Sequence, residues 1–359
     1  MVRCDHRPGP EHRPRPAAEV LTWSRRLLDP ALRRAVEAMP DAMRGVASFH
    51  FGWCDERGSR AGRPYVPPKG TAAGGKAIRP ALTLLAAEAA GGTAAAALPA
   101  AVAVELAHNF SLLHDDVMDG DLTRRHRPTA WTVFGTNAAV LAGDALLAAA
   151  YEVLAEEPSP AVARSVRILA RAVLDLVEGQ HADLAFEERA DVTLDECLAM
   201  ASRKTGALIG AACALGALHG GATAARTDRF RVFGERLGLA FQLVDDLLGI
   251  WGDPAVTGKP VHSDLCSRKK SLPVVAALTS GTPAGAELAG LYHRGEPLTA
   301  EEAAHAAALI DASGGRDWAT AHAGELLADA LTDLDAAGAD TAPAAELQAL
   351  AHLITHRDH

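Results

Sequence analysis

Residues 111–129 read Ser111-Leu-Leu-His-Asp-Asp-Val-Met-Asp-Gly-Asp-Leu-Thr-Arg-Arg-His-Arg-Pro-Thr129 and place carboxylates at the end of a helix, directly before several cations. Asp115 and Asp119 are four residues apart, so on a helix they share one face, with Asp116 beside them. Oxygen ligands of this kind favour Mg²⁺, which binds one or two carboxylates together with substrate phosphates. The cations that follow, Arg124, Arg125 and Arg127, can hold the same phosphates. The stretch therefore predicts a metal and phosphate site.

A second stretch, residues 241–254, repeats this pattern as Phe-Gln-Leu-Val-Asp-Asp-Leu-Leu-Gly-Ile-Trp-Gly-Asp-Pro. Asp245 and Asp246 come late in an apolar helical run, and Lys259, Lys269 and further cations follow. The alternative is a pair of solvated acidic helix ends. That alternative is disfavoured because acidic residues at a helix C-terminus oppose the helix dipole unless a cation compensates.

Both stretches resemble the two aspartate-rich motifs of the trans-isoprenyl (polyprenyl) diphosphate synthase family. The resemblance runs in the family's order from about residue 17 to the C-terminus. It extends to Gly74-Gly75-Lys76-Ala77-Ile78-Arg79-Pro80, to His108 in Glu-Leu-Ala-His-Asn-Phe-Ser-Leu-Leu-His-Asp-Asp, to Lys204-Thr205, and to Lys269-Lys270-Ser271-Leu272-Pro273.

The resemblance implies head-to-tail prenyl transfer, in which an allylic diphosphate ionises and isopentenyl diphosphate attacks the cation. It implies that Mg²⁺, with Mn²⁺ as a substitute, is bound by Asp115, Asp119 and Asp245, with Asp116 and Asp246 in support. It assigns the allylic diphosphate to Arg124, Lys204 and Lys259, with Gln180 as a weaker candidate, and isopentenyl diphosphate to Lys76, Arg79, His108 and Arg125. Further substrate contacts are expected at Thr205, Gln242 and Lys269.

Composition predicts a single all-α domain. The 359 residues are 49% hydrophobic but only 4% aromatic, and alanine is in heavy use, which favours packed helices. A net charge of −10 argues against a nucleic-acid partner. The five cysteines are widely spaced and form no CxxC, which is typical of reduced thiols in the cytoplasm. No run of about 18 uncharged apolar residues is present, so we expect no membrane span; the resemblance implies a homodimer.

The order of segments predicts a catalytic domain over residues 17–359 around a deep central cavity. Residues 1–16, rich in Pro, Arg and His, predict a disordered tail, and residues 52–75 predict a long exposed loop. The loop ends in two glycines before Lys76 and Arg79, a plausible anion cradle at a helix start. Helices are predicted at about 17–39, 80–91, 97–116, 136–155, 159–186, 194–216, 224–250, 271–280, 299–312, 315–336 and 343–355.

Three rival functions are compatible with parts of the sequence. A redox di-metal protein would use Glu-x-x-His pairs, which occur at Glu105/His108, Glu178/His181 and Glu302/His305, but it leaves the Asp pairs and their cations unexplained. A terpene cyclase resembles the first motif but usually differs in the second. An inactive partner subunit of a heteromeric synthase typically loses aspartates or cations that this chain keeps.

Three positions depart from the family's usual pattern. Gly249 stands where the second motif usually ends in Asp, and the nearest later acid is Asp253. His126 and His262 stand where glycine is frequent. If the usual aspartate supports the metal only through water, Gly249→Asp should change the catalytic constant less than about tenfold.

Product length is predicted from the helix that leads into the first motif. Ser111, Ala107 and Val104 point within about 80° of Asp115 and can line a channel, while Phe110 lies about 7.5 Å below the metal site along the axis. In the resembled family, an aromatic residue five positions before the first motif is associated with geranylgeranyl diphosphate, and aromatics at four and five positions with farnesyl diphosphate. We therefore expect geranylgeranyl diphosphate, with farnesyl or longer-chain polyprenyl diphosphate as alternatives.

Overall fold

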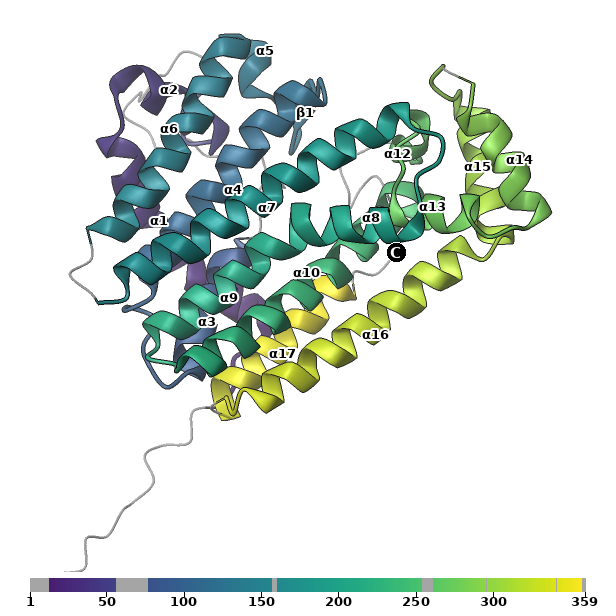
Figure 1. Cartoon of the computed structure of the whole chain (residues 1–359). Coiled ribbons are helices and arrows are strands. Elements are labelled where there is room, and N and C mark those ends of the chain that lie inside the picture. The colour runs from purple at the N-terminus through teal and green to yellow at the C-terminus, as the bar shows by residue number, and fades with distance from the viewer. Residues whose placement is uncertain are drawn as a thin grey trace, which may run out of the picture.

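The chain forms a helical bundle in a computed structural model that describes residues 13–55, 77–156, 160–253, 261–294, 296–339 and 341–356 (Figure 1). The N-terminal helices are α1 (Ala17–Ala38), α2 (Asp41–His50), α3 (Ile78–Ala89), α4 (Leu98–Met118), α5 (Ala130–Phe134), α6 (Thr136–Ala155) and α7 (Val162–Glu188). There follow α8 (Leu194–Ala201), the π-helical turn η1 (Ser202–Gly206), α9 (Ala207–His219), α10 (Ala224–Trp251), α12 (Ser263–Cys266), α13 (Leu272–Leu278), α14 (Pro283–Tyr292), α15 (Ala300–Ala312), α16 (Gly315–Ala336) and α17 (Thr341–Thr355).

Helix α9 lies at the centre of the bundle and packs against α3, α7 and α10. It is buried from Leu208 to Ala217, as expected for a helix that is apolar on every face. Small residues bring the helices close together: a side chain at Gly216 would lie 2.9 Å from the Cβ of Ala86 on α3. Alanine and glycine therefore allow these helices to pack closely together.

Helix α1 shows how amphipathic helices close the bundle. Its buried positions Val20, Ser24, Leu28, Leu32 and Val36 recur every four residues and form one stripe. The helix packs against α3, α4 and α17, while α16 runs along α10. Figure 1 places α14 and α15 at the end of the molecule away from α1 and α2.

Helix α6 is long and apolar enough, by length and composition alone, to cross a membrane. The apolar window within Thr136–Ala155 has a mean hydropathy of 1.6 and is 39% buried in the folded chain. A core helix of a soluble protein passes the same test, so this single helix is weak support for a membrane span.

The predicted all-α architecture is confirmed, and the differences lie in short elements. Helices α2, α5, α12 and α14 were not predicted, because helices of ten residues or fewer carry little periodicity. The two-stranded hairpin of β1 (Thr123–Arg124) and β2 (Arg127–Pro128) was not predicted either. The helix predicted at 194–216 is interrupted by η1.

The N-terminal boundary differs slightly from the expected one. Arg15 donates from its backbone N and its Nε to Glu346 on α17, at 2.7 and 2.8 Å, and its guanidinium stacks on Trp23. The folded unit therefore begins before Ala17. The rest of the predicted tail, residues 1–12, and most of the predicted loop, residues 56–75, lie outside the described residues.

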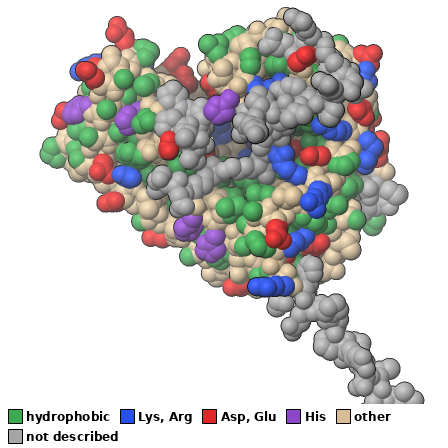
Figure 2. All heavy atoms as spheres, turned by 180° about the vertical axis from the view of Figure 1, so that it is seen from behind, with side chains coloured by type: hydrophobic (Ala, Val, Ile, Leu, Met, Phe, Trp, Pro, Cys, Tyr) green, Lys and Arg blue, Asp and Glu red, His purple; other side chains and the backbone are tan. Residues whose placement is uncertain are grey.

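The cysteines and the surface charge bear on the predicted environment. The described cysteines, Cys54, Cys197, Cys213 and Cys266, form no disulfide with one another. Seen from behind, Lys and Arg side chains gather on the right half of the face in Figure 2, although the net charge of the chain is −10.

Candidate active site

The first aspartate motif ends α4, as the sequence predicted. Asp116 is buried, Asp115 is partly buried and Asp119 is exposed at the helix end. Burial raises the pKa of Asp115 to about 6, and the neighbouring carboxylate of Asp119 adds to this while the ammonium of Lys204 opposes it. The motif is therefore a group of neighbouring carboxylates whose mutual repulsion a bound cation would relieve.

The hairpin that follows turns a guanidinium back onto the motif. Arg124 Nε donates to Asp116 Oδ1 at 2.5 Å, while Asp116 Oδ2 is buried without a hydrogen-bond partner. Arg125 and His126 form the turn with φ of 52° and 61°. Tight two-residue turns of this kind require positive φ, which explains why glycine is frequent at the position of His126 in the resembled family.

A third cation comes from the π-helical turn. Lys204 Nζ donates to Asp183 Oδ2 of α7 at 2.5 Å, and Gln180 Nε2 donates a long hydrogen bond of 3.5 Å to Asp119 Oδ1. A side chain at Gly179 would lie 2.8 Å from the Cα of Lys204, so glycine lets α7 and η1 meet backbone to backbone. Such π-helical turns are frequent at functional sites.

The second motif, on α10, has one buried and one exposed carboxylate. Asp246 Oδ2 accepts from Leu272 N at 3.0 Å, and its Oδ1 accepts from Gln242 Nε2 at 2.8 Å. Gln242 Oε1 in turn accepts from Thr205 Oγ1 at 2.6 Å. Both oxygens of Asp246 thus join η1, α10 and α13, whereas Asp245 is exposed.

Lys269 lies among carboxylates beside this motif. Burial by itself lowers the pKa of Lys269, but the charges of Asp264, Asp246, Asp183 and Asp245 outweigh that effect and raise it. Lys270 instead donates to the backbone oxygens of Phe186 and Glu187 at the end of α7. The two adjacent lysines therefore have different roles, one electrostatic and one structural.

The predicted isopentenyl diphosphate residues meet between α3 and α4. Arg79 Nη1 lies 3.2 Å from His108 Nε2. Because arginine can only donate, this nitrogen of His108 is the acceptor. Burial and the charges of Arg79 and Arg125 lower the pKa of His108 well below its usual value, so the ring is neutral. The result is a positively charged cluster in which the neutral ring of His108 orients the guanidinium of Arg79.

A buried polar network close to Arg79 was not predicted from the sequence. Asn109 Nδ2 donates to the backbone O and the Oε1 of Glu105, at 2.8 and 3.2 Å, and His50 Nε2 donates to Asn109 Oδ1 at 3.0 Å. Glu105 is 4% exposed, and its charge acts on both Arg79 and Arg125. The only sequence signal was a Glu-x-x-His pattern, which the sequence analysis assigned to a rival function.

Several predicted residues lie elsewhere or outside the described residues. Arg127 donates to the backbone oxygens of Phe49 and Cys54, at 2.9 and 3.3 Å. It therefore stabilises the end of α2, in place of the predicted phosphate contact. Lys76 and Lys259 lie outside the described residues.

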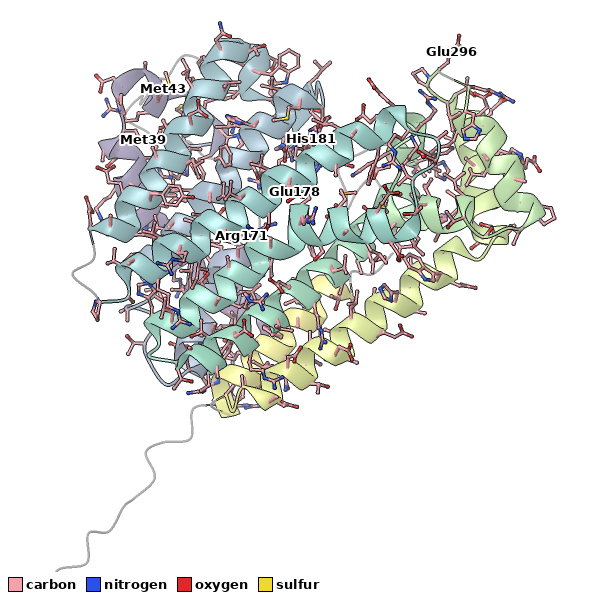
Figure 3. The ribbon with its side chains drawn as sticks, viewed as in Figure 1. Met39, Met43, Arg171, Glu178, His181 and Glu296 are labelled. Atoms are coloured by element: carbon pink, nitrogen blue, oxygen red, sulfur yellow. The ribbon has the colours of Figure 1, made fainter. Side chains whose placement is uncertain are left out.

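The Glu-x-x-His pairs do not converge on one centre. Glu178 and His181 lie along α7 in Figure 3, where Glu178 forms an ion pair with Arg203 at 2.5 Å. Glu302 caps α15 and binds Arg294. Within the described part of the chain, no three His, Cys, Asp or Glu side chains are close enough to hold one metal by themselves. A site that relies on few carboxylates and on substrate oxygens is compatible with this spacing.

The proposed product floor lies on α4. Phe110 is 7% exposed, and its ring meets that of His114 edge to face at 4.8 Å. Gly143 on α6 makes room for the His114 ring. Val104 and Ala107 have 0% and 1% exposure, so they line no open channel, contrary to expectation. Phe110 and His114 therefore pack at the contact of α4 and α6.

Comparison with known proteins agrees with this arrangement. Residues 68–310 match the polyprenyl synthetase family. The (2E,6E)-farnesyl diphosphate synthase of Mycobacterium tuberculosis is 48% identical over 353 residues, covering 98% of this chain and 96% of that protein. The geranylgeranyl diphosphate synthase of the same organism is 46% identical, covering 92% and 91%. The crystal structure of a polyprenyl synthetase from Streptomyces coelicolor superposes with a TM-score of 0.88 at 45% identity, covering 94% of this chain and 99% of that one. The chain belongs to the polyprenyl synthetase family and is a prenyltransferase.

Proposed function

We propose that this prenyltransferase condenses isopentenyl diphosphate with allylic diphosphates and releases geranylgeranyl diphosphate. The observation that carries the product length is Phe110, five residues before Asp115, with the small Ser111 between Phe110 and the rest of the motif. Overall identity does not discriminate, because the two relatives with different products are 48% and 46% identical to the chain. Farnesyl diphosphate is the main alternative.

The residues present fit Mg²⁺, with Mn²⁺ as a substitute. Asp115, Asp119 and Asp245 offer only oxygen ligands, which hard cations prefer. Asp116 Oδ2 and Gln180 Oε1 are buried polar atoms without a hydrogen-bond partner, which supports a ligand or its water at this place. When bound, the ion neutralises charge on the leaving diphosphate.

Different cationic side chains are assigned to each of the two substrates. Lys204 and Arg124 are proposed to hold the allylic diphosphate, exchanging Asp183 and Asp116 for phosphate oxygens as it binds. Lys259 is proposed to join them. Arg79, Arg125 and the neutral His108 are proposed to bind isopentenyl diphosphate, together with Lys76. As the allylic C–O bond breaks and the diphosphate departs, the double bond of isopentenyl diphosphate attacks the allylic cation, and a proton is then lost to the departed diphosphate. The step requires that the two substrates lie side by side and that water is excluded from the cation.

We also propose that the enzyme is a homodimer through α6 and α7. Leu174 and Val177 are three residues apart on α7 and are 62% and 49% exposed, and Leu141 on the adjoining α6 is 54% exposed. Apolar side chains gathered on neighbouring helices are typical of a protein interface. This face also accounts for the low burial of the apolar α6 without a membrane. The cytoplasmic location stays a prediction.

One experiment tests the function. The protein is incubated with Mg²⁺, isopentenyl diphosphate and each allylic primer, and the dephosphorylated products are identified by chromatography. We expect geranylgeraniol, and we expect Asp115→Ala or Asp245→Ala to lower turnover by at least about a hundredfold with an unchanged circular dichroism spectrum. Unchanged turnover in both variants would refute the assigned site, whereas farnesol as the end product would refute only the product length.

A further inference from the structure

A chain of three side chains connects the end of α2 to the arginines assigned to isopentenyl diphosphate. His50 is the last residue of α2, and its Nε2 lies 3.0 Å from Asn109 Oδ1 on α4. Asn109 Nδ2 donates to the backbone O and the Oε1 of Glu105, one turn earlier on the same helix, at 2.8 and 3.2 Å. Asn109 and Glu105 are 1% and 4% exposed. His50 and Asn109 take no direct part in the proposed reaction, so their role lies in what they contact.

The hydrogen bonds of this chain run in one direction. The backbone O and the ionised carboxylate of Glu105 can only accept, so the amide nitrogen of Asn109 faces them and its Oδ1 faces His50. His50 Nε2 is therefore the donor. Burial and the guanidiniums of the β1–β2 hairpin, that of Arg125 most strongly, lower the pKa of His50 to about 3. The ring is thus neutral and carries its proton on Nε2.

Glu105 is the counter-charge of the arginine pair. Burial raises its pKa, whereas the charges of Arg79 and Arg125 and the hydrogen bond from Asn109 lower it. Arg25 on α1 acts in the same direction as the arginine pair. Burial and the charge of Arg125 lower the pKa of Arg79 to about 10, while the charge of Glu105 opposes the lowering in both arginines. The ionised carboxylate therefore offsets the repulsion between two buried guanidiniums.

We propose that His50 is a positioning residue for the isopentenyl diphosphate site and acts through Asn109 and Glu105. Its proton fixes the direction of the Asn109 amide, which then donates to Glu105 and favours the ionised form of that carboxyl group. The ionised carboxylate holds Arg79 and Arg125 close enough to act on one diphosphate. The inference rests on the proposed function, because it requires that these arginines bind isopentenyl diphosphate.

The hairpin also fixes the position of His50. Arg127 on β2 donates to the backbone O of Phe49 at 2.9 Å, and its guanidinium lies 4.7 Å from the centre of the Phe49 ring. Phe51, which is 1% exposed, meets the His50 ring edge to face at 5.8 Å. The same hairpin carries Arg125 in its turn. One short element therefore places both the histidine that donates and one of the two guanidiniums.

Steady-state kinetics distinguishes this positioning role from packing. Initial rates are measured with isopentenyl diphosphate varied at saturating allylic primer, and then with the primer varied. His50→Phe keeps an aromatic ring but removes the donor, so the KM for isopentenyl diphosphate should rise about fivefold, the effect of one lost hydrogen bond. The KM for the primer and kcat should change less than about twofold. His50→Gln keeps an N–H donor and should restore the KM for isopentenyl diphosphate.

His219→Phe is the matched control. His219 is also partly buried, and its Nε2 lies 3.0 Å from Ser165 Oγ on α7, at the end of α9 farther from η1. The substitution removes a comparable contact between helices and should leave both KM values unchanged. If His50→Phe does not fold, Asn109→Ala interrupts the same chain of hydrogen bonds and should produce the same selective rise.

A double variant tests whether His50 acts through Glu105. His50→Phe combined with Glu105→Gln should raise the KM for isopentenyl diphosphate no further than Glu105→Gln alone. The defect of His50→Phe should also grow as the pH is lowered, because loss of the Asn109 hydrogen bond raises the pKa of Glu105. Equal changes in the two KM values, additive effects in the double variant, or a His50→Gln enzyme as impaired as His50→Phe would overturn the inference and leave the proposed function standing. Absence of turnover by the unmodified enzyme would refute the proposed function and this inference with it.

Discussion

Replacing Phe110 by alanine should lengthen the product by about one isoprene unit. The ring that is removed has roughly the volume of such a unit, and it lies about 7.5 Å from Asp115 along α4. The next residues on the same face are Leu106 and Val102, which are 0% and 2% exposed. Leu106 should therefore become the new floor, and much longer products should not accumulate unless it is also shortened.

The same substitution has a calculable cost in stability. Truncation of a buried phenylalanine costs about 3 kcal/mol or more, which includes the loss of its edge-to-face contact with His114. For a chain of 359 residues the melting temperature should fall by roughly 4 °C or more. Phe230→Ala, at a fully buried position on α10 in a different core cluster, should be at least as destabilising without changing the product.

The assay is the chain length of dephosphorylated products at equal conversion, measured below the melting temperature of each variant. Phe110→Leu offers a milder change if the alanine variant does not fold. A product distribution identical to that of the unmodified enzyme would show that Phe110 is an ordinary core residue. The floor would then have to come from a facing helix.

Three further changes probe parts of the site that depend on distant contacts. Burial lowers the pKa of His50 to about 3, so its ring is neutral in the folded protein. Its contribution to stability is therefore complete above pH 6.5 and is lost as the pH falls toward 3. Between pH 7 and 5, denaturant titration should show that His50→Gln loses about 2 kcal/mol less unfolding free energy than the unmodified protein. Gly179→Ala should destabilise the protein by about 1–3 kcal/mol and lower turnover, because the added methyl meets the backbone of η1, whereas Gly324→Ala on α16, with open space around it, should stabilise by about 0.5–1 kcal/mol. Glu105→Gln should raise the KM for isopentenyl diphosphate more than the KM for the allylic primer, because the substitution removes the buried counter-charge of Arg79 and Arg125. Equal changes in the two KM values would contradict this.

The parts of the fold that were predicted correctly are those with a long local signal. Helices α1, α4 and α10 have sustained apolar patterns of about 20 residues or more, and their predicted bounds agree with the structure to within a few residues. The ten-residue α2 and α14 offer fewer than three turns, which is too short for a period to be distinguished from chance. Burial of α2 against α6 and α1 stabilises it instead.

In the candidate site too, relations within one helix were predicted and contacts between distant segments were not. The relation of Asp115 to Asp119 is fixed within one helix, so the spacing in the sequence was sufficient to predict it. Lys204 and Asp183 are 21 residues apart, and His50 and Asn109 are 59 apart. Such pairs depend on how whole helices pack, and a single sequence carries no direct signal for them.

The two acidic helix ends are therefore built by different means. In the first, one helix presents Asp115 and Asp119, and an arginine from the next hairpin holds the buried Asp116 between them. In the second, α10 presents only Asp245, and a glycine on the same face admits Asp264 from α12. Because a side chain at position 249 and the carboxylate of Asp264 compete for the same volume, the glycine is required by the distant acid.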